Sequence, residues 1–199
     1  MLTIHTLTLG AYRVNCYIVS PAGSDRCVVI DPGYEPERIL AFLQKNSLQL
    51  DAILLTHGHF DHVGGAKALA EKIGCPVFLR SEEKTLPEQI TAGPLDATEE
   101  YPAEFTMAGI DFLVLHTPGH TPGSVCLLAE DTMFSGDTLF AGSCGRVDFP
   151  GGSGYEMFRS LTRLKELPGN YRVLPGHGEE TTLDDERRFN PYMQSSRLL

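Results

Sequence analysis

The sequence lacks features that define several classes of protein. Its 199 residues contain no CxxC pair and no excess of basic residues, and no run approaches the ~20 apolar residues of a membrane span. The N-terminal stretch MLTIHTLTLG has no basic segment followed by an apolar run, so it is not a secretory signal. We therefore expect a cytoplasmic protein with no membrane association.

The net charge bears on the expected partners, and the cysteine count bears on the redox state of the protein. The formal net charge is -10, which argues against binding a nucleic-acid backbone, although a local basic pocket for an anionic substrate remains compatible with it. The odd number of cysteines favours buried reduced thiols over a disulfide framework. These cysteines are Cys16, Cys27, Cys75, Cys126 and Cys144. The sequence gives no indication of the oligomeric state.

Apolar patterns predict alternating strands and helices in one domain with a substantial core. The predicted strands are 2–9, 14–19, 26–30, 51–56, 76–80, 110–116, 124–130, 132–137 and 171–175. The predicted helices are 36–46, a segment after Gly64-Gly65 that stops at Gly74, a segment containing Met157 and Leu164, and a short helix capped by Thr182. Residues 81–103 are polar and turn-rich, which predicts a long loop or a short broken helix.

Histidine and aspartate gather where predicted strands end. The stretch LLTHGHFDHVGG, residues 54–65, follows an apolar strand and contains His57, His59, Asp61 and His62. Such groups are costly to bury without partners. Three further strand-like runs end in a histidine or aspartate beside a glycine, which lets the backbone bend sharply. These residues are His120, Asp137 and His177. Strand ends on one edge of a sheet converge, so we expect all seven to meet.

This set of side chains predicts a site for two divalent metal ions. Imidazole and carboxylate are the usual ligands of zinc, the most plausible metal, and of iron or manganese. Their number exceeds the four ligands of one tetrahedral ion and suits two ions about 3.5–4 Å apart. His57 and His59 lie two apart on an extended segment and can share one ion. For His5 and His116 a structural role is favoured.

The motif THGHFDH, together with His120, Asp137 and His177, resembles the metallo-β-lactamase superfamily over nearly the whole chain. Within it, SGDTLFAGSCGRVDFPGG and ERRFNPYM are similar to small glyoxalase II-like hydrolases of the hydroxyacylglutathione hydrolase type. The resemblance implies an α/β fold, a four-layer αββα sandwich of two mixed β-sheets, with the site at one edge. It also implies that residues 1–199 form a single domain without the C-terminal helical domain of full-length glyoxalase II.

The resemblance assigns roles to individual residues. It implies one ion held by His57, His59 and His120, a second held by Asp61, His62 and His177, and Asp137 as the bridge. Asp61 is further implied as a catalytic residue that orients the nucleophile. Asp31 matches a position that supports a ligand through a hydrogen bond, although it could equally cap the turn that follows it.

The implied activity is hydrolysis of a small thioester, an acylglutathione or similar, by a hydroxide that bridges the metals. Arg146 is a candidate for binding a substrate carboxylate, and its alternative role is an ion pair with Asp148 or a bond to a loop carbonyl. Cys144 is favoured as a packing residue over a reactive thiol. Two other functions stay open, a mononuclear iron persulfide dioxygenase, which shares the CGRxDF stretch, and a non-catalytic metal-binding module.

Overall fold

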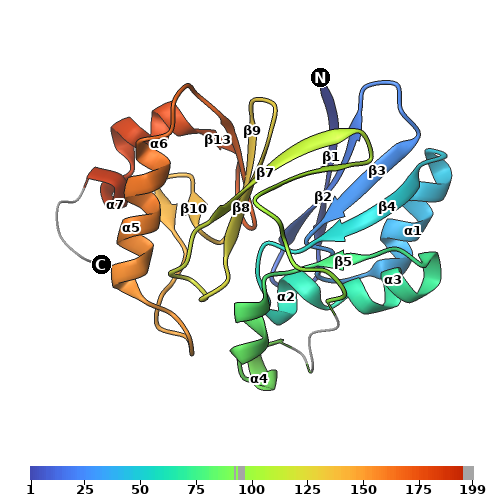
Figure 1. Ribbon diagram of the computed structural model, residues 1–199, viewed down its shortest axis with the longest axis horizontal. Coiled ribbons are helices and arrows are strands. Elements are labelled where there is room, and N and C mark those ends of the chain that lie inside the picture. The colour runs from blue at the N-terminus through green and yellow to red at the C-terminus, as the bar shows by residue number, and fades with distance from the viewer. Residues whose placement is uncertain (92, 94–96, 195–199) are drawn as a thin grey trace.

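Two large β-sheets lie face to face, and helices cover the outer face of each (Figure 1). The computed structural model describes residues 1–91, 93 and 97–194. The first sheet has the order β1-β2-β3-β4-β5: β1 (Leu2–Leu9), β2 (Val14–Pro21), β3 (Arg26–Ile30), β4 (Gln49–Leu54) and β5 (Val77–Phe78). The second has the order β13-β12-β9-β8-β7-β6: β6 (Glu104–Met107), β7 (Ile110–His116), β8 (Val125–Ala129), β9 (Thr132–Gly136), β12 (Arg172–Pro175) and β13 (Thr181–Thr182).

Both sheets are mixed, because each contains parallel and antiparallel pairs. Strands β3, β4 and β5 run parallel, as do β9 and β12, while the other pairs within the two sheets are antiparallel. A two-stranded ribbon, β10 (Leu139–Phe140) with β11 (Ser143–Cys144), lies between β9 and β12 in the chain. The predicted αββα sandwich of two mixed sheets is therefore confirmed.

The helices are α1 (Pro36–Lys45), α2 (Phe60–Val63), α3 (Ala66–Ile73), α4 (Glu88–Thr91), α5 (Gly154–Lys165), α6 (Leu183–Phe189), α7 (Pro191–Gln194) and the 3₁₀ helix η1 (Ser81–Thr85). Of these, α1, α3, α5 and α6 lie close to the helices predicted from sequence, whereas α2 and α7 were not predicted. Gly74 ends α3 with a φ of 81°, a left-handed conformation that glycine adopts without strain. The Thr182 side chain accepts a hydrogen bond from the Asp185 N–H at the start of α6, as the predicted cap requires.

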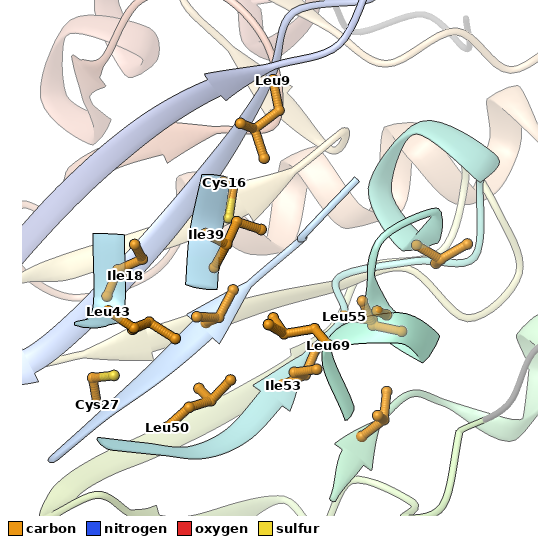
Figure 2. Close-up of a cluster of buried hydrophobic side chains, with 14 of the residues drawn as sticks. Leu9, Cys16, Ile18, Cys27, Ile39, Leu43, Leu50, Ile53, Leu55 and Leu69 are labelled. Carbon is orange, nitrogen blue, oxygen red and sulfur yellow. The ribbon is translucent and has the colours of Figure 1, made fainter. Parts of the chain in front are cut away.

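Three apolar layers hold these elements together. Because side chains alternate along a strand, Tyr17 and Val19 of β2 face the second sheet, whereas Cys16 and Ile18 face α1 and α3. Figure 2 shows the outer layer, in which Ile39 and other apolar side chains pack over the first sheet. The third layer lies between the second sheet and α5, α6 and α7.

The segment 81–103 contains two short helical elements, η1 and α4, so the broken-helix alternative describes it better than a long loop. Residues 92 and 94–96 of that prediction lie outside the described residues. All five cysteines are free, as expected, and Cys16, Cys27 and Cys126 are buried. Within the described residues no helix is both long enough and apolar enough to cross a membrane.

Candidate metal centre

The seven predicted ligands all follow the carboxyl ends of strands. The segment 57–62 follows β4, His120 follows β7, Asp137 follows β9 and His177 follows β12. Hydrogen bonds join the two sheets at this edge, from Val125 N–H to the Thr56 carbonyl at 2.9 Å and from Asn15 N–H to the Gly176 carbonyl at 2.7 Å. Side chains far apart in sequence therefore meet at one place.

The first group of ligand atoms belongs to His57, His59 and His120, which we call the buried trio. Their exposed fractions are 1%, 4% and 3%. One ligand atom from each lies within 4.8 Å of the others, and His59 Nδ1 lies 2.8 Å from His120 Nε2. Three imidazoles this close can share a cation, since each neutral ring offers one nitrogen lone pair as a ligand.

The second group consists of Asp61, His62 and His177, which we call the outer trio. Its ligand atoms also lie within 4.8 Å of one another. His177 Nε2 is 3.3 Å from Asp61 Oδ2 and 3.3 Å from His62 Nε2. The side chains of His177 and Asp61 are 27% and 13% exposed, so this group forms the more accessible half of the site.

Asp137 lies between the two trios. Its Oδ2 is 3.5 Å from His120 Nε2 and 3.7 Å from His177 Nε2, and its Oδ1 is 3.4 Å from His62 Nε2. A Cβ atom at Gly176 would come within 2.3 Å of Asp137 Oδ1. The glycine before His177 therefore leaves the space that this carboxylate occupies.

Unsatisfied polar atoms indicate that these residues fit metal ions. Among the described residues, the buried His57 Nε2, His59 Nε2 and Asp137 Oδ1 have no hydrogen-bond partner. Leaving buried polar atoms unpaired is costly, and metal coordination would satisfy His57 Nε2 and Asp137 Oδ1. Burial lowers the pKa of His57 well below its usual value, and burial together with His120 lowers that of His59 to about 4. Both rings are then neutral, the form that binds metal.

Asp31 orients both the histidine segment and His62. Its carboxylate accepts hydrogen bonds from Thr56 N–H at 2.7 Å and Thr56 Oγ1 at 2.6 Å, and it lies 2.8 Å from His62 Nδ1. These contacts leave Nε2 of His62 facing the ligand group. The structure thus places Asp31 where a supporting residue would act.

The His177 turn is fixed by β2, a connection that sequence reasoning missed. Asn15 Nδ2 donates to the carbonyls of Pro175 and Gly178, at 3.1 and 3.0 Å. Tyr17 Oη donates to the same Pro175 carbonyl at 2.6 Å. The available sequence signal was an asparagine, buried here, within the apolar strand VNCYIV.

Arg146 lies beside the buried trio without contacting a ligand through its side chain. Its guanidinium donates to both Asp148 oxygens, at 2.7 and 2.8 Å, and stacks 3.8 Å from the Phe149 ring centroid. Its carbonyl lies 2.8 Å from His120 Nδ1. The ion pair with Asp148 is the alternative expected from sequence, and because both partners are exposed it leaves the guanidinium accessible.

The remaining candidates lie outside the ligand groups. His116 Nε2 lies 2.8 Å from the Pro122 carbonyl, and the His5 ring packs 5.1 Å from that of Phe42. Burial raises the pKa of Cys144 to about 11, and this residue packs against the third apolar layer, between the second sheet and α5, α6 and α7. A protonated, partly buried thiol fits the predicted packing role.

The sandwich and its clustered histidine and aspartate side chains fit a protein that holds metal ions at one edge of the two sheets. Residues 9–177 match the model of the metallo-beta-lactamase superfamily, and the chain belongs to that superfamily. It is 34% identical to the hydroxyacylglutathione hydrolase GloC of Haemophilus influenzae, covering 98% of this chain and 99% of that protein. The chain thus has a relative of the glyoxalase II type, which agrees with a hydrolase.

Two solved structures share the fold closely. A structure described as TTHA1623 in a di-iron-bound form is 42% identical, with a TM-score of 0.84, covering 94% of this chain and 99% of that one. The BLEG-1 B3 metallo-beta-lactamase is 33% identical, with a TM-score of 0.87, covering 97% and 100%. Proteins with different described properties therefore share this scaffold, so the substrate must be inferred from the site.

Proposed function

We propose that the protein is a binuclear metal-dependent hydrolase of a small thioester. The observation that carries the proposal is the position of Asp137 between the two groups, with Oδ2 3.5 Å from His120 Nε2 and Oδ1 3.4 Å from His62 Nε2. His57, His59 and His120 would hold one ion, and Asp61, His62 and His177 the other. Two ions held there would supply an activated water and polarise a carbonyl.

Residues of the chain would position the attacking water molecule relative to the substrate. The Asp61 carboxylate lies at the accessible side of the site, where it can accept a hydrogen bond from a water molecule and aim it at a substrate carbonyl. A thioester suits such a site, because a leaving thiol with a pKa near ~8.5 departs with little help from a general acid. No serine or cysteine nucleophile is required.

An acylated glutathione is the substrate that we favour. Arg146 presents an exposed guanidinium next to Phe149, whose ring lies 5.8 Å from that of His59. Exposed ion pairs are weak, so a substrate carboxylate can replace Asp148 as its partner. The description of the Haemophilus influenzae relative as a hydroxyacylglutathione hydrolase supports this substrate class.

Zinc is the metal that we propose, with iron and manganese as alternatives. Nitrogen and oxygen ligands accept all three. The relative described in a di-iron-bound form shows that a related chain holds iron. We also propose that one domain carries the whole site, since every ligand lies between residues 57 and 177.

Metal analysis combined with a substrate panel tests the proposal. We expect about two ions per chain and hydrolysis of an acylglutathione, lost on chelation and restored by metal. A single iron with O₂ consumption in the presence of glutathione persulfide would instead establish the dioxygenase. Metal binding without turnover of any substrate in the panel would point to a non-catalytic module.

A further inference from the structure

A carboxylate outside the ligand groups connects the two loops that carry the buried trio. Glu83 of η1 is 0% exposed. Its Oε2 accepts a hydrogen bond from Gly58 N–H at 2.6 Å, and its Oε1 accepts one from Gly123 N–H at 2.6 Å. Gly58 stands between His57 and His59, and Gly123 follows His120 by three residues. One side chain thus holds both loops.

The space around Glu83 is shaped for this contact. A Cβ atom at Gly123 would lie 2.8 Å from Glu83 Oε1 and 2.9 Å from its Cγ, so the loop approaches closely only because residue 123 is glycine. Burial raises the pKa of the Glu83 carboxyl, and hydrogen bonds from Thr121, Gly58 and Gly123 oppose that shift. The carboxylate is therefore surrounded by donors from the two loops.

A backbone hydrogen bond also joins the two loops, so Glu83 is not the sole contact that holds them together. The Val125 N–H donates to the Thr56 carbonyl at 2.9 Å, which joins the same two loops where one leaves β4 and the other enters β8. Without Glu83 the loops would still start from fixed positions. The Gly58 and Gly123 N–H groups would nevertheless lose their partner, and the imidazoles of the buried trio would lose the contact that fixes the distance between their loops.

We propose that Glu83 is a positioning residue that sets the geometry of the buried trio by clamping its two loops. The proposal rests on the proposed function in one respect, that the trio binds a metal ion. Charge-assisted hydrogen bonds are about twice as strong as neutral ones, which suits a carboxylate for this role. Residues that orient metal ligands from outside typically change metal affinity by about 10–100-fold when mutated.

The Glu83→Gln variant tests the clamp with little change of shape. A carboxamide has one oxygen acceptor, so one of the two N–H groups would face another donor. We expect affinity for the more tightly bound ion, measured by chelator competition, to fall by about 10–100-fold. In the metal-free protein, the amide resonances of Gly58 and Gly123 should move upfield. With saturating metal, kcat should fall while KM stays nearly constant.

Two further variants provide the controls. Glu82→Gln changes the neighbouring acid, which pairs with Arg80 and is more exposed, and should leave metal affinity and both glycine resonances unchanged. Glu83→Asp keeps the charge on a shorter side chain and should give an affinity between wild type and Glu83→Gln. If Glu83→Gln does not fold, Glu83→Asp alone must still show reduced affinity with a nearly unchanged Tm.

The outcomes distinguish this inference from the proposed function. Wild-type protein that binds no metal would refute the proposed function, whereas the glycine resonances would still report on the clamp. Wild-type affinity in Glu83→Gln, with unchanged Gly58 and Gly123 resonances, would overturn only the role of Glu83. Equal loss of affinity in Glu82→Gln would also overturn it, because a general charge effect would then explain both.

Discussion

The buried trio and the outer trio use similar side chains in different surroundings. The buried trio is enclosed, and Glu83 accepts hydrogen bonds from both of its loops. The outer trio includes the partly exposed His177, whose turn is held by the first hairpin of the chain through Asn15 and Tyr17. Under the proposed function, the enclosed half would retain its metal ion and the more exposed half would admit water and substrate.

The largest effect is expected from replacing Asp137, the residue that lies between the buried trio and the outer trio. Asp137→Ala deletes the group that faces both trios, so the separation of the ions is no longer fixed. A misplacement of ~1 Å can cost about 10²-fold in rate, and metal loss would cost more. We expect kcat to fall by at least that factor in a chain with a native circular dichroism spectrum. Near-wild-type turnover would show that Asp137 does not bind metal.

Single histidine substitutions in the two trios should have different effects on the amount of bound metal. His177→Ala should reduce the bound metal from about two ions to one per chain, because the buried trio stays complete. His120→Ala should lose the more tightly bound ion, since a buried ligand is removed. Elemental analysis after dialysis against a weak chelator measures both. Identical retention in the two variants would contradict the distinction between a retaining and an accessible half.

Arg146 tests which substrates reach the accessible side. If it binds a carboxylate, Arg146→Ala should raise KM for an acylglutathione by roughly 10- to 150-fold, the range for a hydrogen bond to a charged group. A thioester that lacks this carboxylate should respond little, and metal content should not change. The matched variant Asp148→Ala frees the guanidinium and should not raise KM. Equal losses for both thioesters with a lower Tm would make Arg146 a structural residue.

The smallest effect is expected at the support of the His177 turn. Tyr17→Phe removes only the hydroxyl that donates to the Pro175 carbonyl, while Asn15 keeps its own bond to that carbonyl. The free energy of unfolding should fall by about 1 kcal/mol, which for a chain of this size lowers Tm by about 2–4 °C. Calorimetry of the metal-free protein provides the measurement. If the free energy of binding the ion at the outer trio fell by more than the free energy of unfolding, Tyr17 would also position that half of the site.

The convergence of the seven candidate residues was predictable because each follows an apolar strand and a glycine is nearby. His120 and His177 could therefore be placed together with the 57–62 segment from the sequence alone. Glu83 gave no such signal, since SEEK has the composition of a solvent-exposed turn, yet the fold buries this acid completely. Asn15 and Tyr17 were assigned only to a strand. Their roles depend on contacts between the sheets, which local patterns do not encode.

The bonds that support His177 join residues far apart in the chain. Asn15 and Tyr17 are separated from their partners at Pro175 and Gly178 by 158 to 163 positions. During synthesis on the ribosome, residues 57–62 and Glu83 emerge long before the turn that completes the outer trio. The buried trio is complete once His120 and Gly123, the second partner of Glu83, have emerged, whereas the outer trio is complete only after His177 has been translated.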